Sequence, residues 1–553
     1  MVNILQLVFS VVSLVSFWRR PEDVFESLHD GYAHLAVDPS PEVTKSIAIV
    51  GAGSAGLGAL KALLDLPEEV REGWEIVLYE ARRDVGGLWL ADPPGYEPTP
   101  PNVPETPMYP RVHTNTPHTT MTYPHFPFRP GTPLYPSWEH VQTYHADYAA
   151  HYNLTPYINL NHTVVFAKWH SHDGTGDWHV ETHAQHGNPG GEVVIRRTFD
   201  HLVVAVGHNR FPHIPTWEGT DGWLTNTPAD SPTREIVHSV YYREPAKYAN
   251  MTVIMVGSGT SARDIAQQIE PLARVVYQSV KDGKPTAPDT TVIPKPAISY
   301  FTNDSIVFED GTALYDVDAV ILATGYDLRV PFLSEPQSSV MLTDASPDVN
   351  CTTAPTLTDN LRYIFPLYQQ IFNLAPTMPP TALTFVGLPM LTSQSPTDYA
   401  QGLLISHAFA NESLLPSREE MLQNTVEREE ALRAKGVDPY YDGHRMVLSD
   451  TEPNEYQDNL IEYLKQQGAI PDDGQRYVEE WRWFARANAP LLVRAWKRVQ
   501  KLEEEDEWIA GIETEEEWAD LMVRLAHWQS EWEREHPSRL DSSDIVPNEW
   551  LYG

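Results

Sequence analysis

Short apolar runs rich in β-branched residues recur along the chain, and segments with apolar residues at helical spacing follow them. Residues 46–50 and 253–256 are two such runs, and each predicts a buried strand of a parallel sheet. Further runs lie at residues 75–79 and 274–277, and residues 59–66 between the first pair have helical spacing. Because strand, helix and strand alternate in this order, the pattern predicts an α/β fold built on parallel sheets.

A glycine-rich turn separates the first strand from its helix. Gly51 permits a tight turn, Gly53 lets the backbone approach a pyrophosphate, and Gly56 lets the helix pack closely on the strand. A pyrophosphate there would lie at the helix N-terminus, where free N–H groups and the helix dipole favour an anion. Glu80 follows the strand at 75–79, where an acidic residue accepts hydrogen bonds from a ribose hydroxyl. These residues predict a dinucleotide-binding, Rossmann-like unit.

A second glycine-rich turn follows residues 253–256 and predicts a second Rossmann-like unit. Its third small residue is alanine rather than glycine, which is an accepted variant of the pattern. The strand at 274–277 ends without an acidic residue and a lysine lies nearby, so the site favours NADPH with its 2′-phosphate over NADH. A solvated surface position is an equally good interpretation of that lysine. The residues predicted to bind this cofactor are Gly257, Gly259, Ser261, Ala262 and Lys281.

Several further segments carry motifs in a fixed order. They are residues 86–89 (GGLW), Thr114-Asn115-Thr116-Pro117, residues 200–208 (DHLVVAVGH), residues 318–326 (DAVILATGY) and residues 385–388 (FVGL). Over about residues 46–421, this set resembles the flavin-containing monooxygenase family. The resemblance implies two Rossmann-like domains, with an NADPH domain inserted into a discontinuous FAD domain. It also implies cofactor contacts by Gly87, Leu88, Trp89, Thr324, Gly325 and Gln401.

The resemblance implies a reaction cycle as well. NADPH reduces FAD, the reduced flavin adds O2 to form a C4a-hydroperoxide, and a nitrogen or sulfur atom of a small molecule attacks the distal oxygen. In this family an asparagine at the position of Asn115 helps to hold the oxygenated flavin and NADP+. From the residues alone, an Asx-turn in a proline-rich loop is the alternative role of Asn115.

His238 and Tyr242 complete the catalytic candidates. A satisfied core histidine that links the two cofactor domains is an equally good interpretation of His238. The related Baeyer–Villiger enzymes have tryptophan where this chain has Tyr242, which favours oxidation of a heteroatom over insertion of oxygen next to a ketone. The chain departs from the family fingerprint at Pro232 and Arg234, where that fingerprint has an aromatic residue and a glycine.

Three other functions fit parts of the pattern. A Baeyer–Villiger oxygenase would act on a ketone, and an NADPH oxidase would release peroxide without an organic substrate. A non-catalytic dinucleotide-binding protein would bind FAD and consume no oxygen; the altered motif at Pro232 and Arg234 motivates this alternative. The mass of the product and the release of peroxide separate these functions.

Charge and cysteine content narrow the functions further. The net charge is −37, from 39 basic and 76 acidic residues, which argues against nucleic acid and anionic membrane surfaces as partners. Cys351 is the single cysteine, so a CxxC redox pair is impossible and disulfide reductases are excluded. A metal site is not expected at the clustered His113, His118 and His125. The expected partners are O2 and a small amine or thioether.

The N-terminus differs from the central part of the chain. Residues 1–20 are mostly apolar and end in Arg19 and Arg20, so they are interpreted as a signal peptide or a membrane anchor, and an apolar helix packed on the domain is the alternative. Six Asn-x-Ser/Thr sequons favour a glycoprotein in the secretory pathway, and a cytoplasmic location is the alternative. The predicted domains are residues 46–212 (first part of the FAD domain), 213–330 (NADPH domain), 331–430 (second part of the FAD domain) and 431–553 (acidic helical extension).

The C-terminal extension has a distinct pattern of its own. Residues 479–500 and 515–535 carry tryptophan and aliphatic side chains at helical spacing, which predicts an amphipathic helical extension. Packing of their apolar faces on the core is the favoured interpretation, and a surface for oligomerisation or for a partner is the alternative. The acidic run at 503–507 is expected to be a solvated face.

Overall fold

The computed structural model describes residues 43–96, 98–172, 175–185, 192–227, 232–281, 291–334, 336, 338–343 and 349–536. The predicted signal peptide or anchor at residues 1–20 lies outside these ranges. Within the described ranges, no helix has both the length and the hydropathy needed to cross a membrane. The described residues divide into two compact units, and the first holds residues 43–45 and 72–75, in which the Thr44 N–H donates to the Gly73 carbonyl over 2.8 Å. The other holds the remaining described residues.

The first glycine turn belongs to a sheet of seven strands. The order is β21 (Leu367–Tyr368), β22 (Phe372–Asn373), β23 (Leu383–Phe385), β7 (His201–Val204), β1 (Lys45–Val50), β2 (Trp74–Tyr79) and β3 (Ile158–Asn159). Strands β23, β7 and β1 run parallel, with Leu202 opposite both Ala48 and Leu383. These positions are fully buried, as expected for central strands of a sheet that is covered on both faces.

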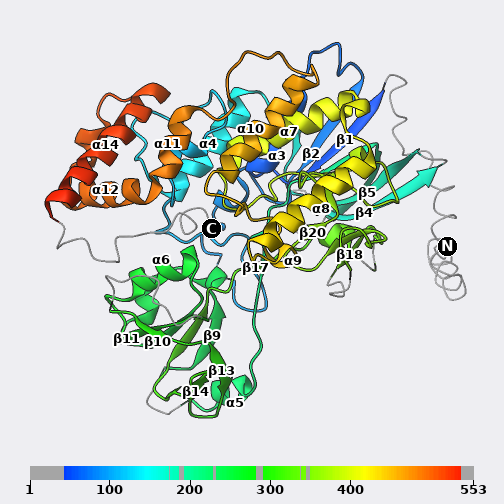
Figure 1. Ribbon diagram of the computed structural model, residues 1–553. Helices are drawn as coiled ribbons and strands as arrows, with labels where there is room; N and C mark the ends of the chain where they lie inside the picture. Colours follow the sequence, from blue (N-terminus) through cyan, green and yellow to red (C-terminus); the bar gives the residue numbers. More distant parts are fainter. Residues whose placement is uncertain are drawn as a thin grey trace, which may run out of the picture. The chain divides into compact units, whose positions relative to one another are not determined.

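Two helices pack closely beside this sheet. They are α3 (Ser54–Leu64) and α7 (Gln394–Ala410), which lie side by side in Figure 1. A Cβ atom at Gly402 of α7 would lie 2.9 Å from the Ala62 Cβ and 3.0 Å from the Ala59 Cα. Small residues therefore bring the two helix backbones together, and α7 becomes the support on which α3 and its glycine turn are held.

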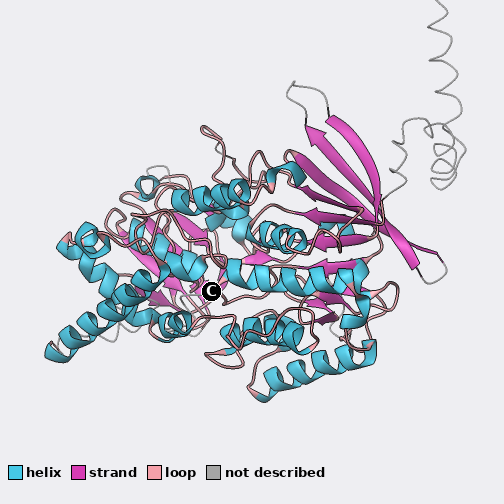
Figure 2. Cartoon of the chain, turned by 90° about the horizontal axis from the view of Figure 1, so that it is seen from above, coloured by secondary structure: helices cyan, strands magenta, loops and turns pink. Residues whose placement is uncertain are grey.

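The second glycine turn belongs to a separate, fully parallel sheet. Its order is β12 (Ile293–Lys295), β11 (Val275–Ser279), β10 (Thr252–Val256), β16 (Ala319–Leu322) and β9 (Glu235–His238), and helix α6 (Thr260–Ile269) follows β10. The predicted α/β class with two Rossmann-like units is thus confirmed, and the mixture of helices and strands is visible in Figure 2.

Smaller antiparallel or mixed sheets fill the connections. One sheet consists of β4 (His162–His172), β5 (Thr175–Gln185) and β6 (Glu192–Phe199), and another of β13 (Ile298–Phe301), β14 (Ile306–Phe308) and β15 (Ala313–Leu314). The remaining strands are β8 (Phe211–Pro212) with β17 (Tyr326–Asp327), and β18 (Met341–Thr343) with β19 (Leu357–Asp359) and β20 (Ile364–Phe365). The buried Trp178 of β5 fastens its sheet to the core by donating from Nε1 to the Ala382 carbonyl over 2.7 Å.

Helices dominate the rest of the described chain. Helix α4 (Trp138–His151) precedes β3, and the later helices are α8 (Arg418–Ala434), α9 (Pro439–Asp442), α10 (Glu452–Gln466), α11 (Glu480–Ala487), α12 (Ala489–Leu502), α13 (Glu505–Ile509) and α14 (Glu515–Glu535). The predicted helical C-terminal extension is confirmed, and residues 479–500 form two helices within it, because α11 ends at its C-cap residue Asn488 and Pro490 lies in the first turn of α12. The acidic run at 503–507 leads into α13, with Glu503 in the left-handed region at φ 60°.

The last helices share one apolar cluster. It contains Leu492 and Trp496 of α12 and Trp518, Leu521 and Met522 of α14. The cluster also includes two residues of the proline-rich segment at 92–136, Leu134 and Tyr135. The apolar faces of α12 and α14 therefore pack on each other and on a segment far away in sequence.

Candidate functional site

Two glycines of the first turn, Gly51 and Gly56, have no room for a Cβ atom. Gly51 has φ +105°, and a Cβ atom there would lie 2.5 Å from the Ala205 carbonyl oxygen at the end of β7. A Cβ atom at Gly56 would lie only 1.7 Å from the Gly51 carbonyl oxygen. Helix α3 thus packs against the turn at a distance that only glycine allows, as the sequence pattern requires.

The N-terminus of α3 is open to a ligand. Gly53 is its N-cap residue and forms no side-chain cap to the first N–H groups of the helix. Gly87, at φ +54°, faces this point, and a Cβ atom there would lie 2.8 Å from the Gly53 Cα. Two facing glycines and a row of free N–H donors form a cradle that fits the pyrophosphate of FAD.

Glu80 and Arg82 fix the walls of this cradle. The buried Glu80 carboxylate accepts the Ala52 N–H over 2.7 Å and the Arg82 N–H over 2.8 Å, and its burial raises its pKa. The Arg82 guanidinium donates to the carbonyls of Gly87 over 2.8 Å and Leu90 over 2.5 Å. It therefore holds the short helical turn Gly87–Trp89, which contains Leu88 and Trp89, against the first glycine turn.

The second glycine turn repeats this geometry. Gly257 has φ +115°, and a Cβ atom there would lie 2.3 Å from the Ala323 carbonyl oxygen at the end of β16. Gly259 is the N-cap of α6, again without a capping side chain. Among the described residues, no heavy atom lies within 4 Å of the place that a Cβ atom of Gly259 would occupy. The described part of the chain thus leaves room beside Gly259 at the start of α6, which fits a second pyrophosphate.

The other predicted residues of the second site lie around α6. Ala262 is fully buried, Ser261 is exposed in the first turn, and the exposed Lys281 follows the end of β11. The Gln278 side chain donates to the Gly257 carbonyl over 2.9 Å, so a neutral amide occupies the end of β11. The Gly51 N–H donates to the Tyr79 carbonyl and the Gly257 N–H to the Ser279 carbonyl, so Val280 is the residue equivalent to Glu80. That position therefore has no carboxylate in the second unit, which agrees with the preference for NADPH.

His238 connects the ends of two neighbouring strands. Its Nε2–H donates to the Gly325 carbonyl over 3.0 Å, and its Nδ1 accepts the Val240 N–H over 3.1 Å. Burial lowers the pKa of His238 to about 4, so the imidazole is neutral at neutral pH. Thr324 donates to the His213 carbonyl over 2.5 Å, and Gly325 has φ +80°. Because both ring nitrogens are engaged within the fold, the geometry favours the interpretation of His238 as a satisfied core histidine.

Tyr242 lies between α6 and the proline-rich segment. Its hydroxyl donates to Gln268 Oε1 over 3.0 Å, and its ring meets the edge of Tyr109 at 5.0 Å. Tyr109 in turn donates to the Asp264 carboxylate of α6. The next residue, Arg243, pairs with Asp92 over 2.5 Å. Tyr242 therefore joins the second Rossmann-like unit to the proline-rich segment, and its direct part in catalysis stays a prediction.

Asn115 presents an available amide. The segment around it is fixed by the Thr114 N–H, which donates to Pro136 over 2.9 Å, and by the His118 N–H, which donates to Leu134 over 2.9 Å. An Asx-turn at Asn115 would need an N–H two residues later, but residue 117 is a proline. The half-buried Asn115 amide has no hydrogen-bond partner among the described residues, so it is free to contact a ligand.

Gln401 supports the site from inside α7. Its Oε1 accepts the Gly387 N–H over 2.9 Å, and its Nε2 donates to the Tyr456 hydroxyl over 2.8 Å. Gly387 has φ +83°, and a Cβ atom there would lie 2.9 Å from Ala55 of α3. Gln401 thus holds the turn at Gly387 in place beside α3. Its direct contact with a cofactor stays a prediction.

Asp398 is a member of the site that the sequence analysis missed. This fully buried carboxylate accepts the Ser54 hydroxyl over 2.7 Å, at the first residue of α3. Desolvation raises the pKa of Asp398 to about 7. It lies in no recognisable motif, and 344 positions separate it from Ser54, so the sequence offered no signal for it.

A cavity of about 370 Å3 lies where the proline-rich segment meets the C-terminal helices. His113, Tyr135 and His140 line it together with Trp496 of α12 and Glu505 of α13. His113 is two residues from Asn115, so the cavity borders the segment that carries the predicted catalytic amide.

Two cradles of the same geometry, each at an uncapped helix N-terminus, define a protein with two dinucleotide sites. The sequence profile of the flavin-binding monooxygenase-like family matches residues 44–287 and 289–471. The chain belongs to this family, and it is therefore an oxidoreductase that uses FAD and NADPH.

Similar proteins cover most of the chain. Flavin-containing monooxygenase FMO GS-OX-like 2 of Arabidopsis thaliana is 29% identical over 468 residues, which are 80% of this chain and 88% of that protein. FMO GS-OX4 of the same plant is 27% identical over 92% of this chain and 99% of its own length. The structure of S-allyl-L-cysteine S-oxygenase from Allium sativum has a TM-score of 0.62 at 23% identity, covering 88% of this chain and 99% of that one. Tmm from Pelagibacter sp. strain HTCC7211 has a TM-score of 0.59 at 21% identity, covering 81% and 90%.

Proposed function

We propose that this enzyme transfers one oxygen atom from O2 to a nitrogen or sulfur atom of a small molecule. For a thioether, the substrate, O2, NADPH and one proton are converted to the sulfoxide, water and NADP+. NADPH supplies the two electrons that reduce the second oxygen atom to water. The observation that carries this proposal is the pair of side-chain-free cradles at Gly53 and Gly259, with an unengaged amide at Asn115.

Two observations bear on which atom of the substrate is oxidised. Tyr242 occupies the position where the resemblance places tryptophan in Baeyer–Villiger enzymes, and its hydroxyl is bonded to Gln268. Among the similar proteins, the structure from Allium sativum is described as an S-oxygenase of S-allyl-L-cysteine. Both features favour a soft heteroatom, sulfur above all, over a ketone.

Each group of residues has a separate task in this proposal. The N–H groups of α3 and the facing glycines Gly53 and Gly87 hold FAD, which supplies the activation of O2 when it is bound and reduced. The N–H groups of α6 in front of Gly259 hold NADPH. The Asn115 amide donates to or accepts from the groups that meet between the two cofactors. The neutral His238 holds Gly325 in place and moves no proton.

Product analysis tests the proposal. The full chain with FAD is incubated with NADPH and O2 and with matched thioether, tertiary amine and cyclic ketone substrates. A gain of one oxygen atom in the thioether or the amine, at one product per NADPH, is the expected result. Oxidation of the ketone alone would replace the proposal with Baeyer–Villiger chemistry. Stoichiometric peroxide with every substrate would indicate an oxidase, and a lack of NADPH oxidation would indicate a non-catalytic protein.

A further inference from the structure

The family profile ends at residue 471, yet the helices beyond it contact the segment that carries Asn115. We call residues 114–122 the Asn115 segment. It is short of regular structure, with one short helical turn at His118–Met121. Its described backbone bonds to Leu134 and Pro136 fix it to a neighbouring stretch of the same proline-rich segment. These backbone bonds join two parts of the proline-rich segment to each other, so contacts with other elements must fix the position of both.

The first contact comes from α14. The buried His118 ring lies between Phe128, at 4.9 Å, and Trp518, whose ring it meets edge to face at 4.6 Å and 85°. Burial lowers the pKa of His118 to about 3, so the ring is neutral. Neither ring nitrogen has a hydrogen-bond partner within the described chain. The aromatic contacts with Phe128 and Trp518 are thus what fixes this side chain.

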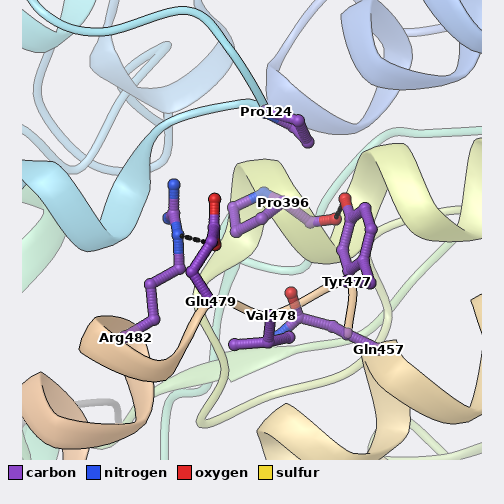
Figure 3. Close-up of a pocket in the computed structure, with 7 residues that line it drawn as sticks. All are labelled: Pro124, Pro396, Gln457, Tyr477, Val478, Glu479 and Arg482. Carbon is purple, nitrogen blue, oxygen red and sulfur yellow. Dashed lines mark hydrogen bonds and ion pairs between the residues drawn. The ribbon is translucent and has the colours of Figure 1, made fainter. Parts of the chain in front are cut away.

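Two further residues of the segment, Thr119 and Thr122, make polar contacts with the C-terminal helices. The Thr119 hydroxyl lies 3.7 Å from the Met522 sulfur, one turn further along α14. The Arg482 guanidinium of α11 donates to the Thr122 hydroxyl over 2.7 Å and to Glu479 over 2.7 Å. Figure 3 shows Arg482 turned towards Glu479, beside a cavity of about 10 Å3 that Pro124 helps to line. That space suits on the order of one water molecule and no organic substrate.

We propose that α11 and α14 form a clamp on the Asn115 segment and that Trp518, Met522 and Arg482 are positioning residues for the Asn115 amide. Three residues of the segment, His118, Thr119 and Thr122, each contact a different side chain of the clamp. The inference rests on the proposed function, because it takes Asn115 to act at the reacting centre. A displacement of about 1 Å at such a group costs roughly a hundredfold in rate, so the C-terminal helices act on the chemistry without touching it.

Trp518→Ala tests the clamp, with Trp528→Ala as the matched control. Both tryptophans lie on α14, but Trp528 packs against Trp508 at 5.2 Å and Arg498 at 3.7 Å, which belong to the C-terminal helices themselves. Hydrogen exchange of the amides of His118 and Thr120 is the first readout, because these amides are bonded in the folded segment. We expect Trp518→Ala to raise their exchange roughly tenfold or more, and Trp528→Ala to leave it unchanged.

Coupling of NADPH oxidation to product is the second readout. Trp518→Ala is expected to raise the peroxide released per NADPH several-fold, while FAD content and the rate of flavin reduction stay as in the wild type. A merely structural role would lower stability in both variants and leave this ratio unchanged. Unaltered exchange in Trp518→Ala, or equal effects of the two substitutions, would overturn the clamp.

A milder variant covers the case in which Trp518→Ala does not fold. Thr122→Val keeps the shape of the side chain and removes the oxygen that accepts from Arg482 and that donates to the Thr119 carbonyl over 3.0 Å. It is expected to raise exchange and peroxide release in the same direction, and wild-type values for both would contradict the clamp. The exchange measurement requires no turnover, so a wild type that oxygenates nothing would defeat the proposed function while the clamp is still tested.

Discussion

Gly53 and Gly259 occupy equivalent places in the two turns, and their surroundings permit a clean test of the two sites. Both have negative φ, so a side chain strains neither backbone. A Cβ atom at Gly53 would lie 3.4 Å from the Gly87 Cα, whereas the space at Gly259 is free of described heavy atoms. A valine at either position would therefore conflict with a bound cofactor more than with the protein.

We expect Gly53→Val to abolish FAD binding and Gly259→Val to retain FAD at the wild-type ratio. In Gly259→Val, reduction by NADPH should slow at least about tenfold, which corresponds to about 1.4 kcal/mol. Flavin absorbance measures the first outcome and anaerobic stopped-flow absorbance the second. Each variant is the control for the other, and reduction of Gly259→Val at the wild-type rate would contradict the assignment of the second cradle to NADPH.

The Asn115 amide carries a second prediction at the scale of one residue. Because it is unengaged within the described fold, Asn115→Ala removes a ligand contact and little else. Peroxide released per NADPH should rise roughly tenfold, since loss of one donor at a reacting centre costs on the order of a hundredfold or more in rate. Asn102→Ala is the control, because Asn102 is exposed in the same proline-rich segment. Equal peroxide release from the two variants would remove Asn115 from the mechanism.

At the scale of elements, the start of α14 sets the position of the clamp. Thr514 and Glu517 form a capping box, in which the Glu517 carboxylate accepts the Thr514 N–H over 3.0 Å and the Thr514 hydroxyl accepts the Glu517 N–H over 3.3 Å. Helix α8 begins with the same device at Ser417 and Glu420. The same kind of substitution can therefore be made at both helices. Thr514 begins α14, which belongs to the clamp, whereas Ser417 begins α8, which does not.

Thr514→Ala should lower the free energy of unfolding by ~1 kcal/mol, and Ser417→Ala by a similar amount, because each removes a helix cap. Chemical denaturation measures both losses. Only Thr514→Ala should also raise hydrogen exchange at the start of α14 and in the Asn115 segment. If Ser417→Ala loosened that segment equally, the effect would be one of global stability rather than of the clamp.

The elements differ in how far the sequence predicts them. β1 and β10 and their turns follow directly from the pattern, because a backbone at φ above +100° beside a carbonyl requires glycine at residues 51 and 257. The sheet of β4, β5 and β6 was not predicted, since β4 mixes exposed and buried positions without strict alternation. The break at Asn488 was missed because the helical spacing of apolar residues continues across it.

The supports of the site illustrate a different limit. Arg482 meets Thr122 across 360 positions, and Met522 meets Thr119 across 403. The spacing of residues within a short stretch of sequence cannot predict such contacts, because they form only when distant segments pack together. The candidate cofactor residues could therefore be named from motifs, whereas Asp398, Arg482 and Trp518 became visible only in the folded chain.

At the scale of the whole molecule, the free energy of unfolding depends on pH, because buried histidines occur in several separate segments of the chain. Burial lowers the pKa of His118 and His444 to about 3 and that of His145 and His238 to about 4. These imidazoles stay neutral in the folded chain, whereas in the unfolded chain they take up protons near the ordinary histidine pKa of 6.5. Their contribution to stability is therefore complete above pH 6.5 and is lost as the pH falls towards 4 and 3.

Asp398 acts in the opposite direction. Its pKa is raised to about 7 from 3.8, so its carboxyl is more easily protonated in the folded chain. Its contribution is complete below the unfolded value and is lost as the pH rises through 7. A single pH profile of the wild type therefore mixes both effects, and a variant is needed to separate the histidines.

His118→Leu isolates one imidazole, because His118 has no hydrogen-bond partner in the described chain that the substitution would break. A tenfold difference in proton affinity between the folded and unfolded chains corresponds to about 1.4 kcal/mol, so the wild type should lose up to a few kcal/mol more stability than His118→Leu between pH 6.5 and pH 4. Thermal unfolding across this range measures the difference in slope. His527→Leu, at an exposed position of α14, should keep the wild-type slope. Parallel profiles for all three proteins would mean that His118 is not held neutral by its burial against Trp518, and the packing of α14 on the Asn115 segment would then be looser in solution than the ring contact implies.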